Sequence, residues 1–176
     1  EGVGKKTLAS IICNNLLNLK KNDLQKNKNF SITELTFKNS KNYNLFKNKS
    51  HPDLFFLESE GKKTITIDQV RRLKKFLSST PSISDYRVVI IDSINQLNLN
   101  GLNMMLKSLE EPPLNTFIFL ISHNASKIID TVNSRLFKFY FKTLNKENFI
   151  KVISQINKIN IPKTELINLG FFLNFS

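Results

Sequence analysis

Residues 87–92 read Arg87-Val88-Val89-Ile90-Ile91-Asp92, a run of four β-branched residues that ends in a carboxylate. Such a run predicts a central parallel strand that is buried on both faces. Residues 116–122 form a second apolar run and predict another buried strand. Residues 51–58 are apolar after a proline and predict a third. Residues 137–141 alternate Phe with Lys or Tyr, which predicts a more exposed strand.

Segments with helical spacing separate these runs. From Thr7 to Leu19, apolar residues recur at intervals of three and four. Residues 67–78 show the same spacing, with Lys and Arg on the opposite face. Residues 99–109 predict a helix that ends before two consecutive prolines. Strands that alternate with helices predict a three-layer α/β fold, with a parallel sheet between two layers of helices.

The remaining segments suggest how the chain is organised. Residues 20–50 are dominated by Lys, Asn and Ser and predict a variable insertion, with a short helix around residues 32–38. A new helical pattern begins at Asn145. We therefore expect a core domain over residues 1–142 and the start of a small helical domain over residues 143–176. The first residue is not Met, and we expect a fragment that begins inside a motif.

Charge and composition narrow the functional classes only in part. The chain has 26 Lys and Arg against 14 Asp and Glu, a net charge of +12. This excess fits a partner with a phosphate backbone. A general bias towards Lys and Asn would produce the same excess, so both explanations stay open.

The few chemically specialised side chains exclude several kinds of site. Cys13 is the single cysteine, so an internal disulfide and a multi-cysteine zinc site are excluded, and we expect Cys13 in the core. His51 and His123 lack the spacing of a metal-binding helix. We predict no metal site from Cys and His. The absence of a signal peptide and of a membrane-spanning apolar run predicts a soluble, cytoplasmic protein.

Residues 2–7 read Gly-Val-Gly-Lys-Lys-Thr and run into the first predicted helix. A phosphate-binding loop needs glycines so that backbone N–H groups can surround phosphate oxygens, a lysine for the terminal phosphates, and then a hydroxyl for magnesium. Gly2, Gly4 and Lys5 match, but Lys6 stands at the hydroxyl position. Thr7 comes one residue later, about 100° around the helix. The N-terminus of an ordinary helix is the alternative interpretation.

Asp92 is the second element of a nucleotide site. In P-loop ATPases an aspartate at the end of such a strand holds magnesium, and a following glutamate commonly activates water. Here Ser93 follows, so no carboxylate stands where a general base is needed. A strand-end cap is the alternative role for Asp92. Whether ATP and magnesium bind to the degenerate set of Gly2, Gly4, Lys5, Thr7 and Asp92 stays open.

Residues 103–113 read NMMLKSLEEPP and are followed by NTFIF. This stretch resembles the "NALLK-LEEPP…T-FIL" signature of bacterial clamp-loader subunits, an AAA+ family, and of their replication-factor relatives. The resemblance extends in unbroken order from Gly2 to about Phe141. It also includes His51-Pro52-Asp53, the helix beginning Ile67-Asp68-Gln69-Val70-Arg71, and Thr131-Val132-Asn133-Ser134-Arg135-Leu136, which is similar to the "TI-SRC" motif.

Two branches of this family differ in their catalytic parts. ATP-hydrolysing motor subunits (gamma and tau) carry an intact phosphate loop and Asp-Glu at the second motif. Lys6 departs from the intact loop and Ser93 departs from the Asp-Glu pattern. In these departures the chain resembles the delta-prime branch of DNA polymerase III. The resemblance implies a subunit of the DNA-directed DNA polymerase (nucleotidyltransferase) holoenzyme without ATPase activity of its own. A motor subunit in which Thr7 replaces the missing hydroxyl is the alternative.

The resemblance also implies a catalytic role for Arg135. In this family the arginine of the Ser-Arg motif faces the ATP of a neighbouring motor subunit, where it acts in trans as an arginine finger. A surface ion pair is the alternative role. Ser122, His123 and Asn124 lie at the end of the strand predicted from Thr116, where the fold carries a residue that senses the γ-phosphate. A strand-end cap is equally open for these three.

The partners follow from the resemblance. It implies a hetero-oligomer with motor subunits and the delta subunit, which loads the sliding clamp on primer–template DNA during bacterial DNA replication. Contacts to DNA would go to the backbone through Lys and Arg, because no basic motif interleaved with aromatic residues appears. A nucleotide kinase of the P-loop class fits less well, because the chain has no arginine-rich lid.

Overall fold

A computed structural model describes residues 4–21, 43–59, 64–124 and 128–141 of the 176-residue chain. By compactness the chain divides into two units, Gly4–Phe137 and a second unit made of residues 1–3 and 138–176. All described helices and strands belong to the first unit. The helix predicted around residues 32–38, the helical pattern from Asn145 and Gly2 lie outside the described residues.

The described part contains a parallel sheet of three strands in the order β1-β2-β3. The strands are β1 (Leu54–Glu58), β2 (Arg87–Asp92) and β3 (Thr116–Ile121). β2 has the bounds predicted for the central strand, and it is buried on both faces as its β-branched run requires. The register places Glu58 beside Asp92 and Asp92 beside Ile121, so the carboxyl ends of the three strands are level.

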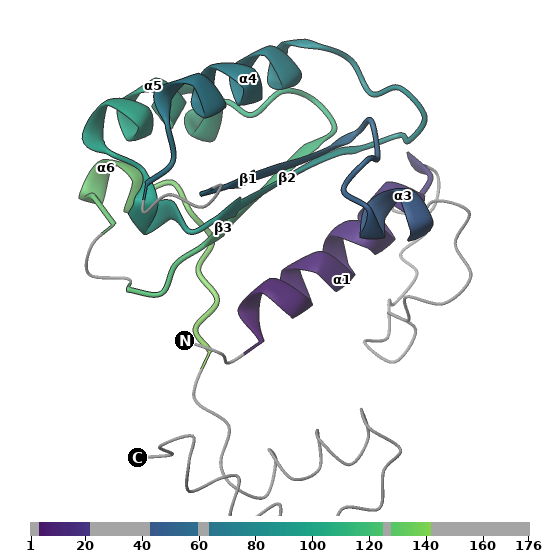
Figure 1. The fold of residues 1–176 in the computed structure, drawn as a ribbon, viewed down its shortest axis with the longest axis horizontal. Helices are drawn as coiled ribbons and strands as arrows, with labels where there is room; N and C mark the ends of the chain where they lie inside the picture. Colours follow the sequence, from purple (N-terminus) through teal and green to yellow (C-terminus); the bar gives the residue numbers. More distant parts are fainter. Residues whose placement is uncertain (1–3, 22–42, 60–63, 125–127, 142–176) are drawn as a thin grey trace, which may run out of the picture. The chain divides into compact units, whose positions relative to one another are not determined.

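Helices cover both faces of this sheet (Figure 1). One face carries α1 (Lys5–Asn18) and the short α3 (Tyr43–Lys47). The other carries α4 (Ile67–Ser78) and α5 (Leu99–Glu110), with the short α6 (Asp130–Asn133) beside α5. A 3-10 turn, η2 (Ile94–Gln96), follows β2. The predicted three-layer α/β fold is confirmed. α3 falls within the segment that was predicted to be a variable insertion.

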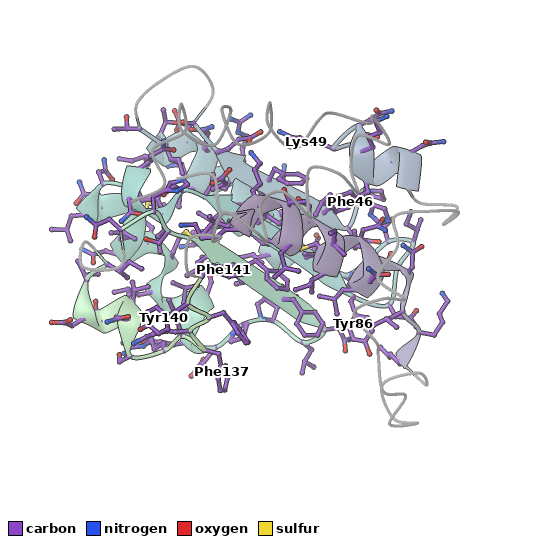
Figure 2. All side chains as sticks on the ribbon, turned by 90° about the horizontal axis from the view of Figure 1, so that it is seen from below. Phe46, Lys49, Tyr86, Phe137, Tyr140 and Phe141 are labelled. Carbon is purple, nitrogen blue, oxygen red and sulfur yellow. The ribbon has the colours of Figure 1, made fainter. Side chains whose placement is uncertain are left out.

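Alternate residues of β2 supply the two halves of the core. Val88 and Ile90 pack against α1, together with the buried Cys13. Val89 and Ile91 pack on the opposite side, against residues of α4 and α5. On the α1 side, the rings of Phe46 and Phe56 pack edge to face, with their centroids 6.1 Å apart. Nζ of Lys49 lies 5.0 Å from the centroid of the Phe56 ring. Figure 2 shows Phe46 and Lys49 near each other on this side of the sheet.

α4 has defined caps at both ends. Thr66 and Gln69 form a reciprocal capping box at its N-terminus. At its C-terminus, the guanidinium of Arg87 donates to the carbonyl oxygens of Phe76 and Ser79 and lies 5.4 Å from the Phe76 ring centroid. Arg87 is therefore a structural residue, which joins the start of the central strand to the end of α4.

Two further findings concern the outer parts of the described chain. The prediction of a strand at residues 137–141 is wrong, because the structure has no strand there and Phe137 is 98% exposed. Alternation of apolar and polar residues produces a strand only where a neighbouring strand supplies backbone hydrogen bonds.

None of the described helices combines the length and the apolarity needed to cross a bilayer.

Candidate functional site

Two carboxylates lie side by side at the carboxyl end of the sheet. Glu58 is the last residue of β1 and Asp92 is the last residue of β2, and the two are paired in register. Alternation along both strands turns these side chains towards the face that α1 covers. Adjacent parallel strands are about 4.8 Å apart, so the two negative charges repel unless a cation lies between them.

Lys6, in the first turn of α1, supplies that cation. Its Nζ lies 2.8 Å from Oδ2 of Asp92 and 3.0 Å from Oε2 of Glu58. The Lys6 side chain is 48% exposed, whereas both carboxylates are more buried. Partial burial alone would lower the pKa of Lys6, but the hydrogen bonds to Asp92 and Glu58 outweigh this effect and raise it. Lys6 is therefore held in its charged form.

A second ammonium and an imidazole lie next to these carboxylates. Lys49 forms an ion pair with the other oxygen of Glu58, and Nε2 of His123 lies 4.0 Å from Oδ1 of Asp92. Partial burial alone would raise the pKa of Glu58, but the hydrogen bonds from Lys49 and Lys6 outweigh it and hold the pKa below its ordinary value. Two carboxylates and two ammonium groups give a neutral cluster, which we call the Lys6 cluster (Lys6, Lys49, Glu58, Asp92).

The Lys6 cluster does not fit a magnesium ion. In a P-loop ATPase the ion is held by the strand-end aspartate and by a hydroxyl next to the loop lysine. Here the hydroxyl position is Lys6, and its ammonium already makes the contact with Asp92. A divalent ion bound at Asp92 would lie beside this positive charge. Among the described residues, no group of three His, Cys, Asp or Glu side chains is arranged to hold a metal ion.

The other predicted nucleotide-site residues lie at the start of α1. Gly4 caps the helix with a left-handed backbone, φ +79°, which glycine adopts without strain, and its carbonyl accepts from the N–H of Leu8. Lys5 and Thr7 follow in the first turn, and within the described residues neither is paired with Asp92. The structure thus brings Lys6, rather than Lys5, to the aspartate.

Asn95 organises the polar groups that follow β2 and β3. Its Oδ1 accepts hydrogen bonds from the hydroxyls of Ser93 and Ser122, at 3.2 and 2.7 Å. The same oxygen lies 3.2 Å from the backbone nitrogen of His123, and Nδ2 of Asn95 donates to the carbonyl oxygen of Asn124. Ser93 is only 3% exposed. The two hydroxyls are therefore engaged within the chain, as strand-end caps are.

Three members of these clusters escaped the sequence-based predictions. The sequence predicted Glu58 only as part of a strand and Lys6 only as a departure from the phosphate-loop pattern. Asn95 was part of a segment after Asp92 in which no carboxylate stands. A signal for Glu58 does exist, because both it and Asp92 end apolar runs, and the carboxyl ends of parallel strands meet at one edge. The strand register that pairs them cannot be read from either run alone.

Arg135 lies just after α6 and forms an ion pair with Glu110, the last residue of α5. Its Nη2 is 2.5 Å from Oε1 of Glu110, and Nη1 donates to the carbonyl oxygen of Thr131. Ser134 contributes its hydroxyl oxygen as a further acceptor, 3.3 Å away. The Arg135 side chain remains 34% exposed. The pair joins the Ser-Arg motif to the Leu-Glu-Glu-Pro-Pro motif.

His51, Asp53 and Ser84 lie together, but they do not form a catalytic triad. Nδ1 of His51 accepts the N–H of Asp53 at 3.1 Å, so a neutral ring carries its proton on Nε2, which faces Ser84 Oγ at 3.5 Å. The Ser84 hydroxyl itself donates to the carbonyl oxygen of Leu17. His51 therefore cannot take a proton from Ser84. The arrangement fastens a loop instead.

The chain is similar to known subunits of DNA polymerase III. The chain matches the family described as "DNA polymerase III, delta subunit" over residues 1–145. DNA polymerase III subunit delta-prime of Pseudomonas aeruginosa is 42% identical over 87 residues, which are 49% of this chain and 26% of that protein. The delta-prime subunit of Buchnera aphidicola subsp. Baizongia pistaciae is 31% identical over 119 residues, 64% of this chain and 35% of that protein.

A solved structure agrees in fold. A DNA polymerase III gamma subunit-related protein from Thermotoga maritima superposes with a TM-score of 0.54 at 24% identity, over 70% of this chain and 40% of that one. The chain thus spans about a quarter to a third of the length of its delta-prime relatives. Because the family match covers most of the chain, the protein belongs to the DNA polymerase III clamp-loader family, and within it to the delta-prime subunits.

Proposed function

We propose that this chain is the AAA+ core of a clamp-loader subunit that does not hydrolyse ATP itself. Its fold would serve as one position in a ring of subunits, and Arg135 would complete the ATP site of a neighbouring motor subunit. The delta subunit, the sliding clamp and primer–template DNA are the other partners we propose, in the cytoplasm. In that ring the protein helps to place the clamp on primed DNA.

The observation that carries this proposal is the state of Ser93. A hydrolytic site needs a base within hydrogen-bonding reach of the attacking water. Ser93 occupies the position after Asp92, is buried, and gives its hydroxyl hydrogen to Asn95. A neutral hydroxyl is a far weaker base than a carboxylate, so Ser93 cannot act as the general base. The Asn95 network also engages Ser122, so the neighbouring strand end offers no free hydroxyl in its place.

The position of Arg135 supports the proposed role in trans. The guanidinium keeps five N–H donors in a fixed fork that suits phosphate oxygens. Glu110, Thr131 and Ser134 account for some of these donors, while a third of the side chain stays exposed. The contacts hold the arginine at the surface and leave part of it accessible. This is the arrangement that a residue acting on a neighbouring subunit requires.

The test of the missing ATPase activity uses the full-length protein, purified alone. Its rate of ATP hydrolysis with magnesium is compared with that of a Lys5→Ala variant, which lacks the lysine of the phosphate loop. We expect the two rates to be equal within error. A clear rate that depends on Lys5 contradicts the proposal and identifies the protein as a motor subunit.

A further inference from the structure

We propose that the ammonium of Lys6 is a permanent intramolecular cation, which takes the place of a divalent metal ion at Asp92 and also bridges to Glu58. The chain thereby keeps the strand-end aspartate of an ATPase site but binds no metal ion through it. This inference concerns the Lys6 cluster alone and does not rest on the proposed function. The cation at these two carboxylates is the ammonium of the chain's own Lys6.

The first step of the argument is that the sheet itself creates the need for a cation. The parallel register sets the last residues of β1 and β2 side by side, and both are acidic. Neither carboxylate can turn to the opposite face, because alternation along each strand fixes the side of the sheet on which its side chain lies. A positive group between them is required whenever both are ionised.

The second step is that Lys6 meets this need with contacts of hydrogen-bonding length. Its Nζ is within 3.0 Å of one oxygen from each carboxylate, so one ammonium bridges the two strands. Helix α1 sets this position, because Lys6 lies in the first turn, at the carboxyl end of the sheet. The long flexible stem of lysine lets the ammonium reach the carboxylates while the helix packs through other residues.

The third step concerns the charge balance. With Lys49 on the remaining side of Glu58, the cluster has two negative and two positive groups. A divalent ion would raise the charge of the cluster to +2 and would lie beside an ammonium. Like charges at distances near 4 Å repel one another, and water screens this repulsion less at a partly buried site. Metal binding at Asp92 is therefore disfavoured while Lys6 is present.

The fourth step concerns the substitutions that should reverse this state. Lys6→Ser removes the ammonium and restores a hydroxyl at the position where P-loop ATPases carry one. Lys6→Met removes the ammonium but keeps a long stem without any metal ligand. Both leave Glu58 and Asp92 facing each other without the bridging charge. Lys5→Met is the matched control, because it removes the neighbouring lysine, which is not paired with Asp92.

The experiment measures Mn²⁺ binding to the full-length protein, without nucleotide, through the loss of the free-ion signal in electron paramagnetic resonance. We expect no binding that depends on Asp92 in the wild type or in Lys5→Met. Lys6→Ser should bind one Mn²⁺ at least about tenfold more tightly than any site of the wild type does, a difference of about 1.4 kcal/mol. The double variant Lys6→Ser with Asp92→Asn should lose this binding.

Thermal unfolding supplies a second readout that needs no paramagnetic ion. Magnesium should raise the Tm of Lys6→Ser and Lys6→Met relative to EDTA and leave the wild-type Tm unchanged, because a ligand stabilises only the state that binds it. Two results overturn the inference. One is Mn²⁺ binding by the wild type that is lost in Asp92→Asn, a comparison that does not depend on any variant at position 6. The other is a folded Lys6→Ser protein that binds no more Mn²⁺ than the wild type does.

Discussion

The guanidinium of Arg135 lies 2.5 Å from the carboxylate of Glu110, and this ion pair connects the segment after α6 to the end of α5. Both side chains are partly exposed, so the pair contributes little to the free energy of unfolding. Its position matters more than its strength. It brings together two sequence motifs that were recognised separately, and it holds the arginine to which we assign a role on a neighbouring subunit.

The first prediction separates that role from the ion pair. Arg135→Ala should lower the free energy of unfolding of the full-length protein by less than about 1 kcal/mol. In the assembled complex it should lower the DNA- and clamp-stimulated ATPase rate at least about tenfold, since such arginines contribute up to about 10³–10⁵. Arg135→Lys should restore little of the rate, because an ammonium keeps the charge but loses the planar fork.

Glu110→Gln is the matched control, because it breaks the same ion pair and leaves the guanidinium in place. The rate of this complex should stay within about threefold of the wild type if Arg135 acts on the neighbour. Equal losses in Arg135→Ala and Glu110→Gln would show that only the ion pair matters. A normal rate in Arg135→Ala rings would leave Arg135 as a surface residue.

The second prediction concerns Asp53, which is only 1% exposed. Its carboxylate accepts the backbone N–H groups of Ser82, Ile83 and Ser84, and so holds the loop before β2. Asp53→Asn replaces one acceptor oxygen by an NH₂ group and leaves at least one of these N–H donors, of which that of Ser84 is buried, without its acceptor. We expect a loss of about 2–3 kcal/mol in the free energy of unfolding, measured by urea denaturation.

Asp85→Asn is the comparison for this loop. Asp85 lies on the same segment, is partly exposed, and contacts Lys20 at 3.8 Å. Its substitution should cost less than about 1 kcal/mol. Similar losses in the two variants would mean that the three N–H contacts of Asp53 have no special weight.

The third prediction is a dependence of stability on pH. Burial lowers the pKa of His51 below its ordinary value of 6.5, although the charge of Asp53 opposes this shift. The folded state then binds fewer protons than the unfolded state, so the contribution of His51 to stability is complete above pH 6.5 and is lost as the pH falls through the lower, folded-state pKa.

His51→Asn isolates this contribution, because its side-chain oxygen can accept the Asp53 N–H but does not titrate. Between neutral pH and a pH well below 6.5, the free energy of unfolding should fall more in the wild type than in this variant. Parallel pH profiles for the two proteins would contradict the assignment.

The fourth prediction concerns the basic face of α4. Lys74 and Lys75 are exposed on the side of the helix that faces away from the sheet. We expect the Lys74→Gln/Lys75→Gln variant to leave the salt dependence of DNA binding by the assembled loader unchanged, as a solvated helix face would. If both lysines touch phosphates, the slope of log affinity against log salt should become shallower by about 2.

Most of the fold could be predicted from local patterns. The β-branched run of β2 and the apolar stripe of α4 gave the observed bounds, because each pattern is visible within a dozen residues and packing agrees with it. The segment at residues 137–141 failed for a related reason. A strand depends on its neighbour, and the alternation of residues along one segment contains no information about whether that neighbour is present.

The candidate site was less predictable, because its contacts join distant parts of the chain. Asp92 was found from its place at the end of a strand, whereas the contact of Lys6 with Glu58 spans 52 residues. From the sequence, Lys6 could be recognised only as a departure from the phosphate-loop pattern of residues 2–7. A lysine at position 6 shows that the hydroxyl is missing, but the sequence does not show which side chains that lysine contacts. Those contacts follow from strand register and helix placement.

The Asn95 network has a consequence for how this lineage can change. One amide receives the hydroxyls of Ser93 and Ser122, and it also binds the chain just beyond β3. Replacing Ser93 by glutamate would introduce a carboxylate into a buried position and remove a donor from Asn95. Position 6 would still carry an ammonium in place of a metal ligand. Under the proposed function, hydrolysis would therefore require substitutions at both positions, because glutamate at position 93 supplies only a base and a hydroxyl at position 6 supplies only a metal ligand.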